Sequence, residues 1–271
     1  MLKSFNTQNL TLDLLAVSTV RTLIEDLANI EKIKTWSLIV TMFGDLDECH
    51  PQSLSGKEIG AILGHIGIKP EAVRVALHRL KKDGWIHATK SGREVEYGLS
   101  QNGLQETAAV YDDVYRRTVK YSNGWKLLID SKDEVNEPIG SRVEIKLFKN
   151  IILAPQSLAV EDRLKMGIDF DRTNVPSWFA DRIVPSNIID IADRLNTMAR
   201  FFDIEFKSES PLDNAAIRLL FLHHWRKMAL RENTWAHIWL FELGPMAQCH
   251  AQITELLERI PRLRPTQFRL I

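Results

Sequence analysis

Between residues 70 and 83, apolar and basic residues recur at helical spacing and form two separate stripes. One stripe is apolar and consists of Val73, Leu77 and Leu80. A second stripe is basic and consists of Arg74, His78 and Lys81, with Arg79 and Lys82 beside it. Spacings of three and four residues place side chains on one face of an α-helix. Pro70 suits the first helical position and Gly84 suits the residue after the last turn, so the pattern predicts a helix over 70–83.

After Gly84 the period of the pattern changes from helical to two. Residues 85–90 and 94–99 are predicted to form two antiparallel strands. Ser91-Gly92 lies between them and is typical of a hairpin turn. The sequence therefore predicts a β-hairpin directly after the helix.

Two further helices are predicted before this segment. An apolar run predicts a helix over 35–44, and Ser55 with Glu58 forms a capping-box pattern that predicts a second helix over 56–63. Three helices followed by a hairpin are the order of a winged helix-turn-helix, with a further helix expected over 101–118 after Ser100. We expect this domain to cover residues 34–122.

Residues 1–33 carry an amphipathic helical pattern from Leu12 to Ile30. Such an N-terminal extension helix has two plausible uses. Its apolar face packs on its own domain, or it pairs with a second subunit. The pattern favours neither.

The remainder of the chain predicts an α+β middle region and a helical end. Residues 123–207 suggest a ferredoxin-like domain, and residues 208–271 suggest a helical C-terminal domain. The middle region is predicted to hold strands at 125–130, 150–154, 157–160 and 178–184, and helices at 138–149 and from 185 onward.

Composition excludes several protein classes. The 271 residues include 35 Lys and Arg against 35 Asp and Glu, so the net charge is zero. Cys49 and Cys249 lie far apart and form no CxxC motif, which argues against a disulfide scaffold or a cysteine zinc site. The longest apolar runs are about half the roughly 18 residues that a membrane span needs. With no signal-peptide pattern at the N-terminus, a cytoplasmic protein is expected.

Charge is concentrated where the helix and hairpin are predicted. Residues 69–93 contain seven Lys or Arg and two acids, a net charge of +5. A basic helix and hairpin on a neutral chain indicate a reader of double-stranded DNA. The candidate DNA-binding residues are Arg74, His78, Arg79, Lys81 and Lys82 on the helix, with Lys90 and Arg93 on the wing. The alternative is a solvated basic helix in an ordinary α+β domain.

A family resemblance rests on two motifs. Residues 35–45 read TWSLIVTMFGD, and the pattern G-I-x4-V-R-x-A-L-x-R-L-x3-G-W is met by Gly67, Ile68, Val73, Arg74, Ala76, Leu77, Arg79, Leu80, Gly84 and Trp85. This combination resembles the phenylacetic-acid-degradation repressor (PaaX) family. The resemblance implies a ligand-responsive transcriptional repressor, a middle domain similar to the Cas2 nuclease fold, and an acyl-CoA effector such as phenylacetyl-CoA. We also expect a homodimer. Residues 219–235 are also similar to the family, although Leu230 to Asn233 replace its usual proline and aspartate.

Three other interpretations follow from single features. The similarity to the Cas2 fold implies a metal-dependent nuclease as an alternative, because Asp130 ends the first strand, where such nucleases place a metal-binding aspartate. One carboxylate supplies too few ligands for a cation unless a symmetric dimer brings two together. A winged helix can also serve protein contacts alone. His223, His224 and His237 are expected to be core residues rather than metal ligands, because adjacent helical residues point about 100° apart. We expect no enzyme activity, cofactor or metal, and the residues that bind the effector stay unknown.

Overall fold

The computed structural model describes residues 20–46, 52–131, 144–158, 165–169, 172, 175–205 and 210–265. These residues form two compact units. Unit 1 comprises the described parts of Met1–Gln105, Phe201–His223 and Arg259–Ile271, and unit 2 comprises those of Glu106–Arg200 and His224–Glu258. Residues of the expected C-terminal range 208–271 thus occur in both units. The mixture of helices and antiparallel sheets confirms the α+β class.

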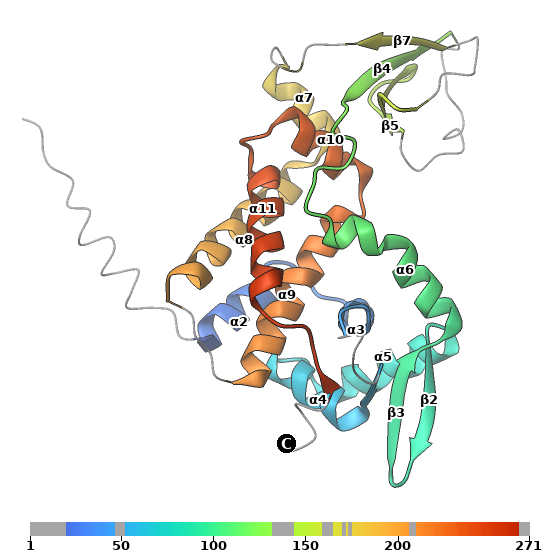
Figure 1. The fold of residues 1–271 in the computed structure, drawn as a ribbon, viewed down its shortest axis with the longest axis vertical. Helices are drawn as coiled ribbons and strands as arrows, with labels where there is room; N and C mark the ends of the chain where they lie inside the picture. Colours follow the sequence, from blue (N-terminus) through green and yellow to red (C-terminus); the bar gives the residue numbers. More distant parts are fainter. Residues whose placement is uncertain are drawn as a thin grey trace, which may run out of the picture. The chain divides into compact units, whose positions relative to one another are not determined.

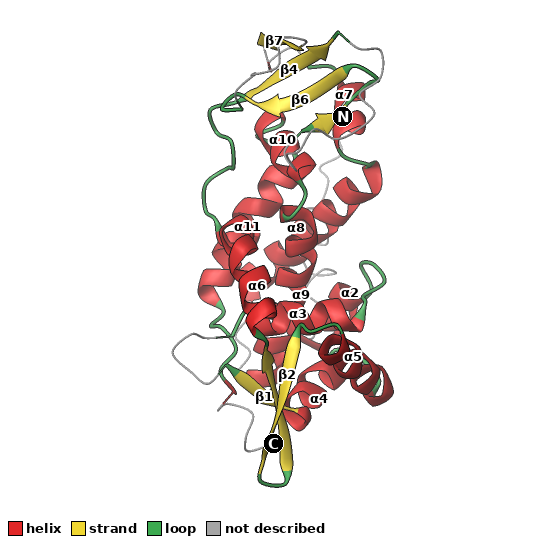
Figure 2. Cartoon of the chain, turned by 90° about the vertical axis from the view of Figure 1, so that its right-hand side faces the viewer, coloured by secondary structure: helices red, strands yellow, loops and turns green. Residues whose placement is uncertain are grey.

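Unit 1 is built around a run of helices and a small sheet. In chain order its elements are α2 (Val20–Ala28), α3 (Thr35–Gly44), β1 (Ser53–Ser55), α4 (Gly56–His65), α5 (Pro70–Lys82), β2 (Ile86–Ser91), β3 (Glu94–Leu99) and the start of α6 (Gln101–Tyr115). The three strands are antiparallel in the order β1-β3-β2. Figure 2 shows the β2–β3 hairpin extending beyond α4 and α5. The helices and hairpin predicted between 35 and 99 are confirmed to within a few residues.

Helix α4 begins with the predicted capping box. The Ser55 hydroxyl accepts a hydrogen bond from the Glu58 backbone N–H at 3.2 Å, and the Glu58 carboxylate accepts one from the Ser55 N–H at 2.6 Å. Two backbone N–H groups that the helix leaves unpaired are thereby satisfied.

The N-terminal extension packs on its own chain where it is described. In α2 the side chains of Leu23, Ile24 and Leu27 are buried, and the Arg21 guanidinium donates to the His65 carbonyl at 3.0 Å. Of the two uses expected for this helix, residues 20–28 adopt intramolecular packing. The predicted pattern from Leu12 to residue 19 lies outside the described residues.

A buried ion pair lies inside unit 1. Helix α9 (Pro211–Ala229) carries Arg218, whose guanidinium meets both carboxylate oxygens of Asp45 at 2.6 and 2.7 Å. The side chains are 2% and 0% exposed. Arg218 also donates to the Ile260 carbonyl. This bidentate pair joins the end of α3 to a segment 173 residues later.

Unit 2 contains a four-stranded antiparallel sheet. Its strands are β4 (Trp125–Asp130), β5 (Ile145–Lys146), β6 (Ile151–Pro155) and β7 (Lys165–Asp169), in the order β5-β6-β4-β7. Besides most of α6 and the end of α9, its helices are α7 (Ser177–Ile183), α8 (Ser186–Glu205), which ends in unit 1, α10 (Glu232–Leu240) and α11 (Pro245–Arg259). Figure 1 labels most of these elements.

Three predictions in the middle region are wrong. The segment predicted as a strand at 178–184 is helix α7, because Phe179 and Ile183, four residues apart, are both buried on one helical face. Of the helix predicted at 138–149, residues 138–143 lie outside the described part. Residues 145–146 form β5. Ile145 and Leu147 are buried and Lys146 between them is exposed, which is the alternation of a strand. Of the strand predicted at 157–160, residues 159–160 lie outside the described part. Residues 157–158 turn after Pro155, since the Leu158 N–H bonds the Pro155 carbonyl.

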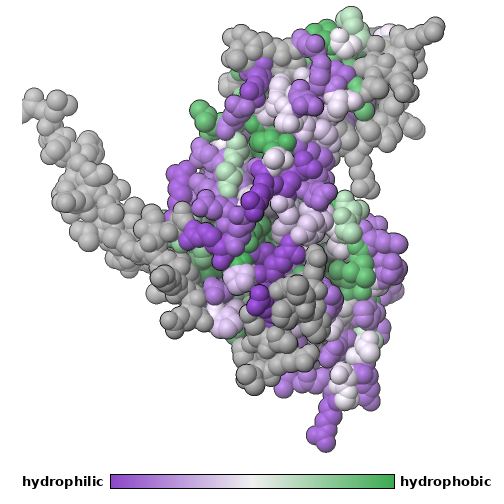
Figure 3. Space-filling view, viewed as in Figure 1, coloured by the Kyte–Doolittle hydropathy of each residue, from purple (hydrophilic) through white to green (hydrophobic). Residues whose placement is uncertain are grey.

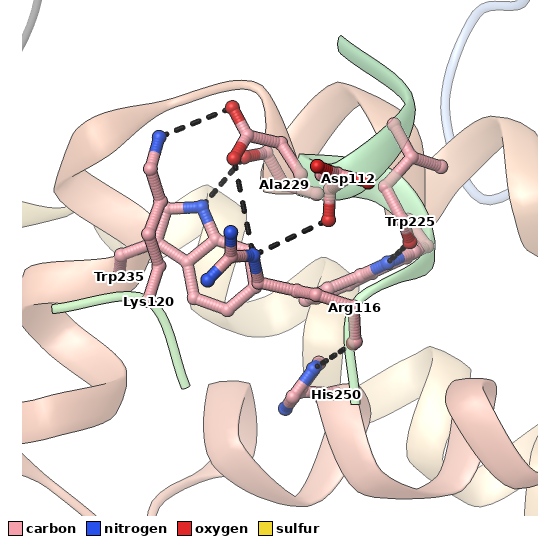
Figure 4. Close-up of polar contacts among 9 residues, drawn as sticks. Asp112, Arg116, Lys120, Trp225, Ala229, Trp235 and His250 are labelled. Carbon is pink, nitrogen blue, oxygen red and sulfur yellow. Dashed lines mark hydrogen bonds and ion pairs between the residues drawn. The ribbon is translucent and has the colours of Figure 1, made fainter. Parts of the chain in front are cut away.

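The C-terminal helices of unit 2 pack their aromatic side chains with the end of α6 (Figure 4). The Trp225 indole donates to the Val114 carbonyl at 2.9 Å, and the Trp235 indole donates to the Ala229 carbonyl at 2.8 Å. The two indoles meet edge to face, 6.0 Å apart between ring centroids. Both are buried, so these tryptophans form core with satisfied N–H groups.

Candidate nucleic-acid interface

Helix α5 has defined ends at the positions that the sequence predicted. Pro70 occupies its first turn, and Gly84 has a φ of +75°. The Trp85 N–H bonds the Leu80 carbonyl at 2.9 Å and the Gly84 N–H bonds the Lys81 carbonyl at 3.2 Å. This pair of bonds is a Schellman motif, in which glycine takes the left-handed conformation without steric cost. The chain therefore leaves α5 in a fixed direction toward the hairpin.

The inner face of α5 packs on the core of unit 1. Its buried residues are Val73, Ala76, Leu77 and Leu80. The apolar stripe predicted for this helix is thus confirmed, and Ala76 joins it. Burial of this face orients the opposite face toward solvent.

Successive residues of an α-helix are about 100° apart, so the buried set also defines which residues point directly outward. These are Glu71, Val75, His78 and Lys82, which we call the outer stripe. Arg74 and Lys81 lie on one flank of this stripe and Arg79 lies on the other. All seven predicted DNA-binding residues are exposed, but the helix divides the five on α5 among three directions.

Two of these arginines are paired with acids of the same helix. Arg74 lies 3.0 Å from the Glu71 carboxylate, and Arg79 lies 3.4 Å from the Asp83 carboxylate. The Arg79 guanidinium also lies 5.7 Å from the centroid of the Trp36 ring on α3. Exposed pairs of this kind contribute about 0.2–0.5 kcal/mol, so a phosphate can readily replace the carboxylate.

The other predicted residues are unpaired within the structure. His78, Lys81, Lys82, Lys90 and Arg93 make no side-chain hydrogen bond or ion pair with any described residue. Their charges and hydrogen-bond donors are therefore accessible to a partner.

The hairpin presents two of these residues at its tip. Ser91 pairs with Glu94 across the ladder, so the turn residues are Gly92 and Arg93, one residue later than predicted. Gly92 has a φ of +61°. Arg93 lies in the turn and Lys90 is one residue before Ser91, and the projecting tip is hydrophilic in Figure 3.

The base of the hairpin is held against α6. Ser100 donates its hydroxyl to the Gly84 carbonyl at 2.5 Å and its N–H to the Trp85 carbonyl at 3.0 Å. A Cβ at Gly103 would lie 2.2 Å from that Trp85 carbonyl oxygen, so only glycine allows the close approach. These contacts fix the hairpin relative to the end of α5.

The residues proposed for other chemistry are buried or not described. His223, His224 and His237 are buried, as expected of core histidines, and His223 Nδ1 lies 3.2 Å from the Thr41 hydroxyl. Asp130 ends β4, and its side chain lies outside the described part. No three His, Cys, Asp or Glu side chains of the described residues are grouped to hold a metal ion. Among the described helices, none is long and apolar enough to cross a membrane.

Sequence reasoning missed two features of unit 1. The first is the Asp45–Arg218 pair, which no local pattern indicates. The second is Val75, which lies on the outer stripe and is 69% exposed. Its position opposite the buried stripe was available from helical geometry alone.

Comparison with known proteins matches the region that carries this surface. Residues 34–103 match the family model described as PaaX-like protein. The chain is also similar to the transcriptional repressor PaaX of Escherichia coli (strain K12), with 31% identity over 114 residues, 42% of this chain and 36% of that protein. The match thus spans about a third of the length of this curated relative. Helices α3, α4 and α5 and the hairpin all lie within the family match, so the part of the chain that carries this surface is similar to the PaaX-like protein family.

Proposed function

We propose that this chain is a DNA-binding transcriptional repressor, with a winged helix-turn-helix over residues 34–122. One observation carries the proposal. An exposed face of α5 and the tip of the adjoining hairpin together present seven predicted DNA-binding residues, five of which have no partner among the described residues. A relative named as a transcriptional repressor supports the same conclusion.

In this proposal α5 enters the major groove. Its outer stripe faces the base edges, and the flanking Arg74, Arg79 and Lys81 contact phosphates on either side. Lys90 and Arg93 at the hairpin tip contact the backbone beside the groove. Phosphate contacts supply affinity, and the outer stripe supplies sequence preference.

We further propose that the protein acts as a homodimer and releases DNA when it binds an acyl-CoA such as phenylacetyl-CoA. A two-fold dimer would recognise a near-palindromic operator with half-sites about 34–36 Å apart, or a multiple of that distance. The effector would bind one conformation more tightly than the other, which is the condition for a ligand to shift an equilibrium. Repression of a phenylacetate-type catabolic operon rests on the family resemblance.

The test is fluorescence anisotropy of the purified chain on its own promoter region and on a scrambled duplex of equal length. We expect tight binding to the promoter only, and its loss on addition of phenylacetyl-CoA but not acetyl-CoA. Promoter binding that is indifferent to both thioesters would refute the effector and retain the DNA-binding function. Equal weak binding to both duplexes would refute the DNA-binding function.

A further inference from the structure

The outer stripe of α5 has an apolar residue at its centre. Val75 follows Glu71 by one turn and precedes His78 and Lys82, and all four side chains are exposed. Among the described residues of unit 1, Val75 is the most exposed large apolar side chain, at 69%, against 46% for Leu104 and 42% for Val95.

The stability of unit 1 does not account for this valine. The side chain packs against little of the protein, so its burial contributes little. A β-branched residue is also a weaker helix former than alanine, lysine or glutamate at an exposed helical position. The valine therefore leaves an apolar surface in water, surrounded by charged residues, without a compensating contact inside the chain.

The major groove offers one apolar feature to a helix that enters it. Thymine alone carries a 5-methyl group there, and the edges of the other bases present only hydrogen-bond donors and acceptors. Polar side chains on both sides of Val75 are suited to those donors and acceptors and to the phosphates. A short branched apolar side chain at the centre of the face matches the methyl group in chemistry and size.

We propose that Val75 is a specificity-determining residue that contacts the 5-methyl group of one thymine in each half-site. The inference rests on the proposed DNA-binding function and assigns one of its base contacts. Removing the methyl group from that thymine should weaken binding about fourfold, because burying one methyl-sized group contributes roughly 0.8 kcal/mol.

The experiment first selects binding sites for the full chain from a randomised duplex library. Each thymine of the selected site is then replaced by deoxyuridine, which lacks only the 5-methyl group, and the dissociation constants are compared. The wild-type chain should lose about fourfold at one position of each half-site. The same scan with Val75→Ala should show no loss there, because alanine does not reach the methyl group.

Val95→Ala serves as the matched control, since it truncates another exposed valine on the hairpin. It should retain the wild-type sensitivity to uracil. Alanine is favourable in a helix, so Val75→Ala should fold normally. If no sequence is enriched, the DNA-binding function itself is overturned. If a site is enriched but uracil has no effect, or the wild-type chain and Val75→Ala are equally sensitive, only the Val75 contact is overturned.

Discussion

Helix α5 exposes its arginine and histidine side chains, whereas helix α9 buries those of Arg218, His223 and His224. In α5, Arg74 is 74% exposed and pairs only with an acid one turn away. In α9, Arg218 is 2% exposed and forms a bidentate pair with a carboxylate from a distant segment. The same residue types thus lie on the protein surface in one helix and in the buried core in the other.

The two helices differ in the arrangement of their apolar residues. Helix α5 confines them to one stripe, apart from Val75, so the polar side chains can all face water. In α9 every residue from Ala215 to Trp225 is buried, which surrounds its polar side chains with apolar ones. A buried polar group must be paired within the protein, whereas an exposed one is available to a partner.

The strongest test of this contrast removes one arginine from each helix. Arg218→Ala should lower the free energy of unfolding by about 3–5 kcal/mol, because it removes the guanidinium that forms the bidentate pair with the buried Asp45 carboxylate. Arg74→Ala should change it by less than about 0.5 kcal/mol, since its ion pair is exposed. Urea unfolding followed by tryptophan fluorescence measures both. Similar losses for the two variants would contradict the difference.

Histidines give a second test, through pH. Burial lowers the pKa of His237 from 6.5 to about 4 and lowers the pKa of His250 in the same direction. Since the unfolded chain takes up these protons first, stability is full above pH 6.5 and falls as the pH drops toward 4. For His237 the loss between pH 7 and pH 5 should be about 2 kcal/mol.

Thermal unfolding at the two pH values checks this expectation. His237→Leu should reduce the pH dependence of the unfolding temperature, because it removes the buried imidazole. If the His237→Leu variant keeps the full pH dependence of stability, that dependence comes from other titratable groups.

Measurements of DNA binding test the exposed basic residues of α5 and the hairpin directly. Lys81→Ala with Lys90→Ala should reduce the slope of log affinity against log salt by about two, because each of these lysines is proposed to contact one phosphate. Lys32→Ala removes an exposed lysine outside α5 and the hairpin and should leave the slope unchanged. Anisotropy titrations at several salt concentrations give the slopes. An unaltered slope in the double variant would place the DNA elsewhere on the protein.

Local signals allowed the helix and hairpin of this surface to be predicted from the sequence. Pro70, Gly84 and the Ser55–Glu58 capping box act on neighbouring backbone groups, so their effect does not depend on the rest of the fold. The run that became α7 is short and apolar, and a short apolar run does not distinguish a strand from a helix.

The contacts that complete unit 1 depend on tertiary structure. Asp45 and Arg218 are separated by 173 residues, and neither is remarkable within its own segment. Lys81 and Arg79 were predicted as parts of one basic surface, yet they lie on opposite flanks of α5. Residues two positions apart on an α-helix point about 200° apart, so helical geometry alone separates them.

The smallest expected effects concern the N-cap residues of two helices. At one of them, the residue that favours folding stability differs from the residue that favours DNA binding. Ser55 caps α4, so Ser55→Ala should lower the free energy of unfolding by about 1 kcal/mol. The N-cap residue of α5 is instead Lys69, whose backbone is extended as a cap requires but whose side chain makes no cap hydrogen bond. Lys69→Ser should therefore stabilise the protein by up to about 1 kcal/mol and weaken DNA binding, because it removes a positive charge beside the helix proposed to enter the groove. Urea unfolding and anisotropy on the same preparation give both quantities, and a Lys69→Ser variant that loses stability or binds DNA as tightly as the wild-type chain would contradict this trade-off.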